Sequence, residues 1–194
     1  VAAQPGPVES PVQLEFTAAG GGLAPATALT GPVATAPPSS DPSFRELELS
    51  EAFAFGGGVG VKLPGGLVAE GQLLFSPGVD LLTSDDGTHV SDADHLALTG
   101  HLVWRFPLPL VRPFVGAGGG WKRVAFDDPS ALGTEAEGDV TGTLLAGAHV
   151  DVVPGMTIRV EARSHLSSFT DPRVDESRFQ NDLAFLAGMV WTVP

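Results

Sequence analysis

The chain has 194 residues, of which 43% are hydrophobic, and it carries a formal net charge of −13 at pH 7. That length is typical of a single domain, and the acidic charge argues against nucleic acid as a partner. Cysteine is absent, so disulfides and cysteine-ligated metals are excluded.

The sequence offers no candidate for a membrane-spanning helix. The longest uncharged run covers residues 16–40 and contains four prolines, which a helix across a bilayer would not accommodate. Mean hydropathy is nevertheless positive, at +0.18. Since only helices and closed β-barrels satisfy every backbone group in lipid, a membrane protein with this sequence would have to be a β-barrel.

The first ten residues are polar and contain two prolines. We expect residues 1–10 to form a leader or linker and residues 11–194 to form the folded domain. Because the chain begins at Val1 and not at methionine, we interpret it as a processed, exported protein. Residue 1 is not cysteine, so a lipid anchor is not expected there.

Side chains of alternating polarity predict eight strands along the rest of the chain. They cover approximately residues 11–21, 51–63, 66–76, 95–106, 110–125, 140–153, 156–168 and 182–193. Three connections are short turns with proline or glycine, and they alternate strictly with four long ones, at residues 22–50, 77–94, 126–139 and 169–181. Since alternate connections of an up-and-down barrel lie at opposite ends, the long ones gather at one end, as in outer-membrane barrels.

Most of the predicted strands have one face without charge, which we expect to contact lipid. In the strand over 95–106 this face consists of Leu96, Leu98, Leu102, Trp104 and Phe106. A soluble barrel with the apolar face inside is the alternative, because alternation alone does not say which face is buried. Strands of about 11 residues are long enough to cross a bilayer, and polar faces with both signs of charge suit an ion-paired interior. The sequence therefore predicts an all-β fold: an eight-stranded antiparallel up-and-down transmembrane β-barrel of a bacterial outer membrane, with loops external and turns periplasmic.

The polar faces predict a salt-bridge network that fills the lumen, because an eight-stranded barrel is just wide enough for side chains. The residues expected in this network are Glu15, Glu70, Arg105, Arg112, Asp151, Arg159, Glu161 and Arg163. Glu161 is expected to pair with an arginine from another strand, since an unpaired buried carboxylate is costly. The alternative is a porin-like passive channel with an ion-conducting lumen.

Three segments resemble the eight-stranded outer-membrane β-barrel family, the OmpA/OmpX-like transmembrane barrel domain. "VRPFVGAGGGW" (111–121) is similar to its fifth strand, and "IRVEARSHL" (158–166) is similar to its seventh. "NDLAFLAGMVWTVP" (181–194) resembles the C-terminal strand recognised by the barrel-assembly machinery. The resemblance implies an assembly signal at Gly188, Trp191 and Val193. It says little about activity, because the family includes structural anchors, adhesins, small channels and lipid-modifying enzymes.

Two predicted loops are strongly acidic. Residues 80–94 and residues 127–139 each contain five carboxylates, which at this density could bind divalent cations or simply form a solvated surface. His89 and His95 are too isolated in sequence to predict a zinc site, and no metal site or cofactor is predicted. We expect a structural or interaction role, in adhesion or partner docking, without catalysis. The partners expected are outer-membrane lipid, the barrel-assembly machinery and, at the acidic loops, other envelope proteins or divalent cations.

The pair His165 and Ser167 raises a different hypothesis. One branch of the family consists of lipid A deacylases, which use a histidine and a serine two residues apart with a nearby carboxylate, here Asp171 or Asp175. A serine nucleophile needs its histidine within hydrogen-bond reach, and a lipid substrate requires the pair to face the membrane. Both residues share strand parity with Arg159, which places them in the lumen unless a β-bulge intervenes. We therefore predict no catalytic residues, with a deacylase-like esterase as the second alternative.

Overall fold

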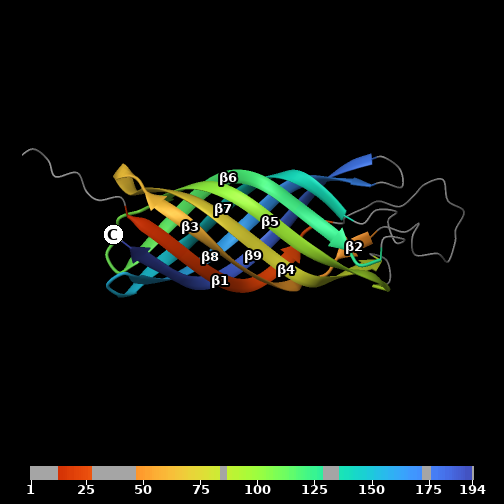
Figure 1. The fold of residues 1–194 in the computed structure, drawn as a ribbon, viewed down its shortest axis with the longest axis horizontal. Coiled ribbons are helices and arrows are strands. Elements are labelled where there is room, and N and C mark those ends of the chain that lie inside the picture. The colour runs from red at the N-terminus through yellow and green to blue at the C-terminus, as the bar shows by residue number, and fades with distance from the viewer. Residues whose placement is uncertain (1–12, 28–46, 84–86, 129–135, 172–175, 194) are drawn as a thin grey trace, which may run out of the picture.

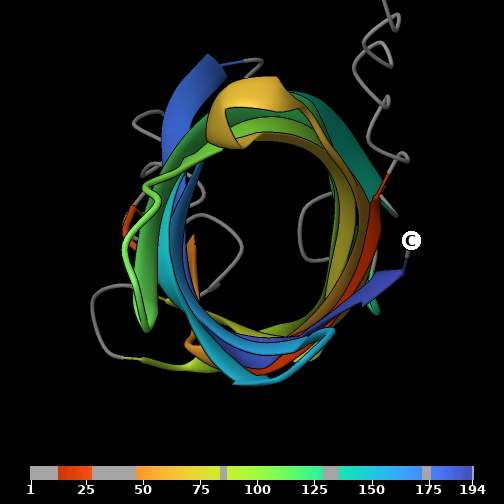
Figure 2. The same ribbon diagram turned by 90° about the vertical axis from the view of Figure 1, so that its left-hand side faces the viewer.

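A computed structural model describes residues 13–27, 47–83, 87–128, 136–171 and 176–193. In these ranges eight long β-strands form a closed antiparallel barrel (Figures 1 and 2). They are β1 (Leu14–Pro25), β3 (Ala52–Lys62), β4 (Leu67–Thr83), β5 (His89–Arg105), β6 (Val111–Phe126), β7 (Ala136–Val153), β8 (Met156–Asp171) and β9 (Glu176–Val193). A short strand, β2 (Leu47–Leu49), pairs with the end of β4. The expected leader, residues 1–10, lies outside the described residues.

Each long strand pairs with its sequence neighbours, and β9 closes the ring on β1. The closing pair runs from Leu14 opposite Val193 to Pro25 opposite Asp182. The fold class predicted from the sequence is confirmed. In a ring of this order, β4 and β8 are four positions apart and stand on opposite sides of the lumen, as do β5 and β9.

The two ends of the barrel differ. Short connections join β3 to β4 through a 3-10 turn (Pro64–Gly66), β5 to β6, and β7 to β8. These turns lie at the end where β9 finishes, on the left of Figure 1, and the remaining strand ends, among them the end of β4 and the start of β5, lie at the opposite end. We call these the turn end and the loop end.

Strands at the loop end are longer than the sequence predicted. β4 continues to Thr83 and β5 begins at His89, so most of the loop expected over 77–94 is strand. The β8–β9 ladder likewise extends to Asp171 opposite Glu176. The predicted boundaries were wrong here. The prediction ended each strand where its apolar outward face ends, but backbone pairing with the neighbouring strand continues beyond that point.

The polarity of the wall inverts along β4. In its first part Glu70 and Gln72 are buried and Leu73 is 47% exposed, so the apolar face is outside. Beyond a register irregularity after Ser76, Val79 and Leu81 are fully buried, while the Asp80 side chain is about half exposed. Gly78 provides the positive φ of 59° at this irregularity. A wall with its apolar side inward suits water, so we take this level as the boundary of the membrane-spanning segments.

Between that boundary and the turn end, the outside of the barrel is apolar. Phe53, Leu98, Leu144 and Phe185 are each more than half exposed on different strands. A contiguous band of this kind would be unusual on a monomeric soluble protein, and it matches the lipid-facing band of membrane barrels. The ranges that the structure describes contain no helix long and apolar enough to cross a membrane.

Candidate functional site: the lumen and its ends

A chain of salt bridges crosses the lumen. The Arg105 guanidinium donates to both carboxylate oxygens of Glu15, at 2.7 and 2.5 Å, and to Glu70 at 3.1 Å. Arg159 donates to the two oxygens of Glu70 at 2.9 and 3.0 Å. These residues come from β1, β5, β4 and β8, and all four side chains are nearly inaccessible to solvent. The chain of contacts therefore joins opposite walls of the barrel.

Further contacts of β8 side chains connect the members of this network into a ring. Arg159 contacts Glu161 at 2.7 Å, Arg163 contacts both Glu161 and Gln72, and Gln72 donates to Glu70 at 2.8 Å. The arginines that pair with Glu161 in the described residues both belong to its own strand, not to another strand as expected. This follows from strand geometry, because residues i and i+2 lie on the same face. The network's three arginines and three glutamates balance in charge, and Lys62 at the turn end adds a fourth cation, 3.4 Å from Glu15.

A second polar level lies nearer the loop end. Lys122 on β6 donates to Asp182 and Gln180 on β9, each at 2.8 Å. His95 on β5 approaches the same Asp182 oxygen at 3.6 Å from the opposite wall. The ammonium and carboxylate are both buried, so this level is also neutral overall and spans the lumen. The sequence analysis missed it, because Lys122 and Asp182 are far apart in sequence and only the ring closure brings them together.

Apolar side chains close the lumen above this level. The buried cluster at the loop end consists of Leu47, Leu49, Val79, Leu81, Ala93, Val124 and Phe126. Nearer the turn end, Phe114 lies against Arg159, with the guanidinium carbon 4.6 Å from the ring centroid, a cation–π contact. Thus the opening seen between the ribbons in Figure 2 is occupied by side chains from several strands.

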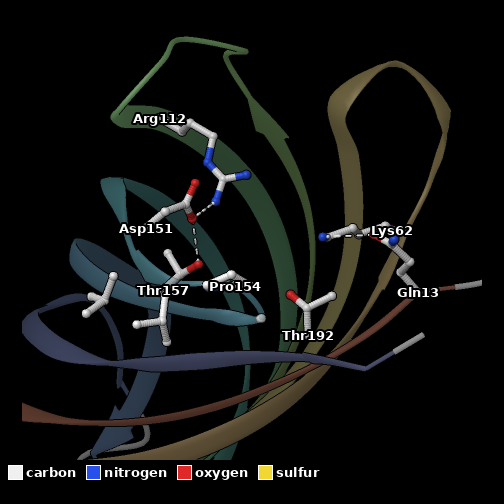
Figure 3. A pocket seen from close by; sticks show the side chains of 10 residues that line it. Gln13, Lys62, Arg112, Asp151, Pro154, Thr157 and Thr192 are labelled. Carbon is white, nitrogen blue, oxygen red and sulfur yellow. Dashed lines mark hydrogen bonds and ion pairs between the residues drawn. The ribbon is translucent and has the colours of Figure 1, made fainter.

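The turn end is different, because a cavity of about 600 Å³ opens there (Figure 3). Arg112 pairs with Asp151, which also accepts a hydrogen bond from Thr157 at 2.8 Å. Lys62 faces them from the other side of the mouth, bonded to Gln13 at 3.0 Å. Arg112 and Asp151 were expected in the luminal network, but the structure places them at this mouth, where the Asp151 side chain is 54% exposed.

No protein-family model and no curated protein matches the sequence. Solved structures, however, align with almost the whole chain. Neisserial surface protein A superposes with a TM-score of 0.59 at 13% identity, covering 94% of this chain and 97% of that one. OprG from Pseudomonas aeruginosa gives 0.56 at 11%, covering 92% and 95%. Ail of Yersinia pestis, solved with the heparin analogue sucrose octasulfate, gives 0.54 at 10%, covering 94% and 99%. The chain has the fold of the eight-stranded outer-membrane β-barrels.

The last strand of the barrel, β9, contains the three residues of the expected assembly signal. Trp191 and Val193 lie on the outer face of β9 and are partly exposed. Gly188 lies against β1, where a Cβ atom would come within 2.1 Å of the Ala18 carbonyl oxygen. The glycine is therefore required for the closing strand pair, whatever its part in assembly.

In the same barrel, His165 and Ser167 both lie buried in the lumen. Neither ring nitrogen of His165 nor the Ser167 hydroxyl has a hydrogen-bond partner among the described residues. The carboxylate opposite His165 in the β8–β9 register is Asp182, which is paired with Lys122. Asp175 and the side chain of Asp171, the acids expected from sequence, lie outside the described residues. The geometry thus shows a buried polar pair without the hydrogen bond that activates a serine.

Proposed function

We propose that this chain is an integral protein of a bacterial outer membrane, with its loop end external and its turn end periplasmic. Its lumen is closed to ions, and its role is structural or interaction-based. The observation that carries the proposal is the Glu15–Arg105–Glu70–Arg159 chain of contacts, which joins opposite walls with balanced charge. Such a network holds the barrel rigid and leaves the external end as the surface available to partners.

The external end supports an interaction role. β4 and β5 each have 17 residues, whereas about 9–11 residues suffice to cross a bilayer. The additional residues of β4 and β5 extend the folded barrel beyond the membrane boundary at the loop end. Ail, one of the structures with this fold, is named for attachment and was solved with a polyanion. With a net charge of −13, the present chain is suited to cationic or neutral partners instead.

Two further partners belong to the proposal. Outer-membrane lipid covers the apolar band, and the barrel-assembly machinery recognises β9 through Gly188, Trp191 and Val193. Substituting Trp191 by alanine tests the second point: we expect less protein in the outer membrane, while the purified variant refolds in detergent as the wild type does. A refolding defect of equal size would assign Trp191 to barrel stability alone.

Planar-bilayer recording tests the closed lumen. Purified protein whose insertion has been verified should give no steady conductance, because two polar levels and an apolar cluster obstruct the path. A porin reconstituted in the same way serves as the positive control. Stable channels from the wild-type chain would contradict the closed lumen and favour the alternative role as a small passive channel, entered through the cavity at the turn end.

A further inference from the structure

Three side chains able to bind a metal lie together on the outer face of the β4–β5 hairpin, above the membrane boundary. The Nε2 atom of His89 is 2.9 Å from an Asp92 oxygen and 3.6 Å from an Asp80 oxygen. One ligand atom from each residue lies within 4.8 Å of the other two. All three side chains are about half exposed, so an ion can reach them from solvent, which is the external side in the proposed orientation.

We propose that Asp80, His89 and Asp92 form an external binding site for a divalent transition-metal ion, of which Zn²⁺ is the best match. Zinc binds histidine nitrogen and carboxylate oxygen at about 2.0–2.2 Å. In a tetrahedral site these bond lengths separate neighbouring ligand atoms by roughly 3.3 Å. The two distances measured from His89 lie on either side of this value, so small side-chain rotations suffice to seat the ion.

The backbone brings these ligands to one face. His89 and Asp92 are three residues apart, and in a regular strand they would point to opposite sides. The register between β4 and β5 is irregular at this point, with Leu81 opposite Ser91 but Leu82 opposite His89. This bulge turns His89 outward beside Asp92. Bulges commonly re-aim a side chain in this way.

The two carboxylates face each other directly, because Asp80 and Asp92 are register partners on neighbouring strands. Like charges directly opposite destabilise a strand pair, and a cation between them removes that cost. The strands are held from below by Leu81 and Ala93, which are buried in the apolar cluster of the loop end. The ligands therefore stand on a rigid support, as a preorganised site requires.

The donor set selects among cations. Calcium and magnesium prefer six or more oxygen ligands or a retained water shell, whereas an imidazole nitrogen suits zinc, nickel and copper. Three protein ligands leave a coordination position for water or for a carboxylate of another molecule. The hydrogen bond that the His89 ring donates to the Asp92 carboxylate raises the pKa of His89, so a proton competes with the metal for Nε2.

Isothermal titration with ZnCl₂ tests this site, using the full chain folded in detergent micelles and a non-chelating buffer just above neutral pH. We expect one Zn²⁺ per chain. His89→Ala, Asp80→Asn and Asp92→Asn should each weaken binding by at least about tenfold. Asp127→Asn is the matched control: it removes an exposed carboxylate at the same end of the barrel, and it should leave the affinity unchanged.

Three results would overturn the proposal. The first is that the wild type binds Zn²⁺ no more tightly than His89→Ala does. The second is that Asp127→Asn lowers the affinity as much as Asp80→Asn does, which would indicate diffuse attraction to an acidic surface. The third is that calcium chloride binds as tightly as ZnCl₂ and that its binding is insensitive to His89→Ala. Because His89 is exposed, circular dichroism should show the barrel intact in every variant, so loss of binding is separable from misfolding.

Discussion

Arg159 of β8 and Glu70 of β4 form a salt bridge of 2.9 Å although their strands stand on opposite sides of the barrel. Both side chains are almost fully buried. Together with the contact between Glu70 and Arg105 of the adjacent strand β5, this salt bridge connects one wall of the barrel to the other across the lumen.

The first prediction concerns Glu161, which holds Arg159 and Arg163 together. Glu161→Gln leaves two buried guanidinium groups without their shared counter-charge. Breaking a buried pair in this way costs about 3–5 kcal/mol, so we expect a large fall in the free energy of unfolding, measured by urea titration in lipid vesicles. Asp127→Asn, at an exposed position, is the control. A loss below about 1 kcal/mol would show that the network contributes little to stability.

The second prediction concerns the upper polar level. Lys122→Met leaves Asp182 buried without its ammonium partner and should destabilise the barrel strongly. Adding Asp182→Asn removes the uncompensated charge, so the double variant should recover most of the lost stability. Strictly additive losses in the same unfolding experiment would show that the two residues act independently.

The third prediction follows from the raised pKa of His89, whose main cause is the hydrogen bond to Asp92. A raised folded-state pKa means that the stabilising contribution is fully present below the ordinary histidine pKa. It is lost as the pH rises through the folded value. An NMR titration of the His89 ring should give a midpoint above about 6.5, and Asp92→Asn should lower it. An unchanged midpoint in that variant would assign the shift to another group.

The fourth prediction concerns Ser167, whose buried hydroxyl has no hydrogen-bond partner among the described residues. Removing an unsatisfied hydroxyl is nearly neutral or slightly stabilising, so Ser167→Ala should fold as well as the wild type. We also expect the purified protein to release no fatty acid from lipid A or from ester substrates. Ester hydrolysis that disappears in Ser167→Ala would make the protein an enzyme.

The fifth prediction tests orientation. Because the chain has no cysteine, single cysteines can be labelled without background. A membrane-impermeant maleimide added to intact cells should modify Asp127→Cys at the loop end and spare Pro154→Cys at the turn end. Both should react once the membrane is permeabilised. The reverse pattern would invert the proposed topology.

The sequence was sufficient to predict the barrel because its evidence is local. Alternation along each strand, the two kinds of connection and the paired charges are all visible within a few tens of residues. It failed at the loop end, where Val79 and Leu81 turn inward above the membrane and Asp80 turns outward. An apolar outward face identifies a strand that crosses lipid, but the part of a strand that extends into water does not have one.

The partners of individual site residues could not be predicted in the same way. The pairing of Lys122 with Asp182 depends on ring closure, and the meeting of His89 with Asp80 depends on a bulge. Arg112 and Asp151 were expected in the luminal network because their positions along the strands place their side chains on the inner face. The alternation does not tell how close to the end of the barrel an inward-facing residue lies. These contacts depend on the register between strands and on closure of the barrel, and the residue pattern of a single strand carries information on neither.

The placement of Glu70 opposite Arg159 has a consequence for the order of folding. A hairpin of β4 and β5 can pair Glu70 with Arg105, but Arg159 and Arg163 reach their partners on β4 only when the far wall arrives. Before closure, Arg159 and Arg163 share one carboxylate, that of Glu161, so one positive charge on β8 has no counter-charge on its own strand. We therefore expect closure of the ring and neutralisation of its interior to be coupled.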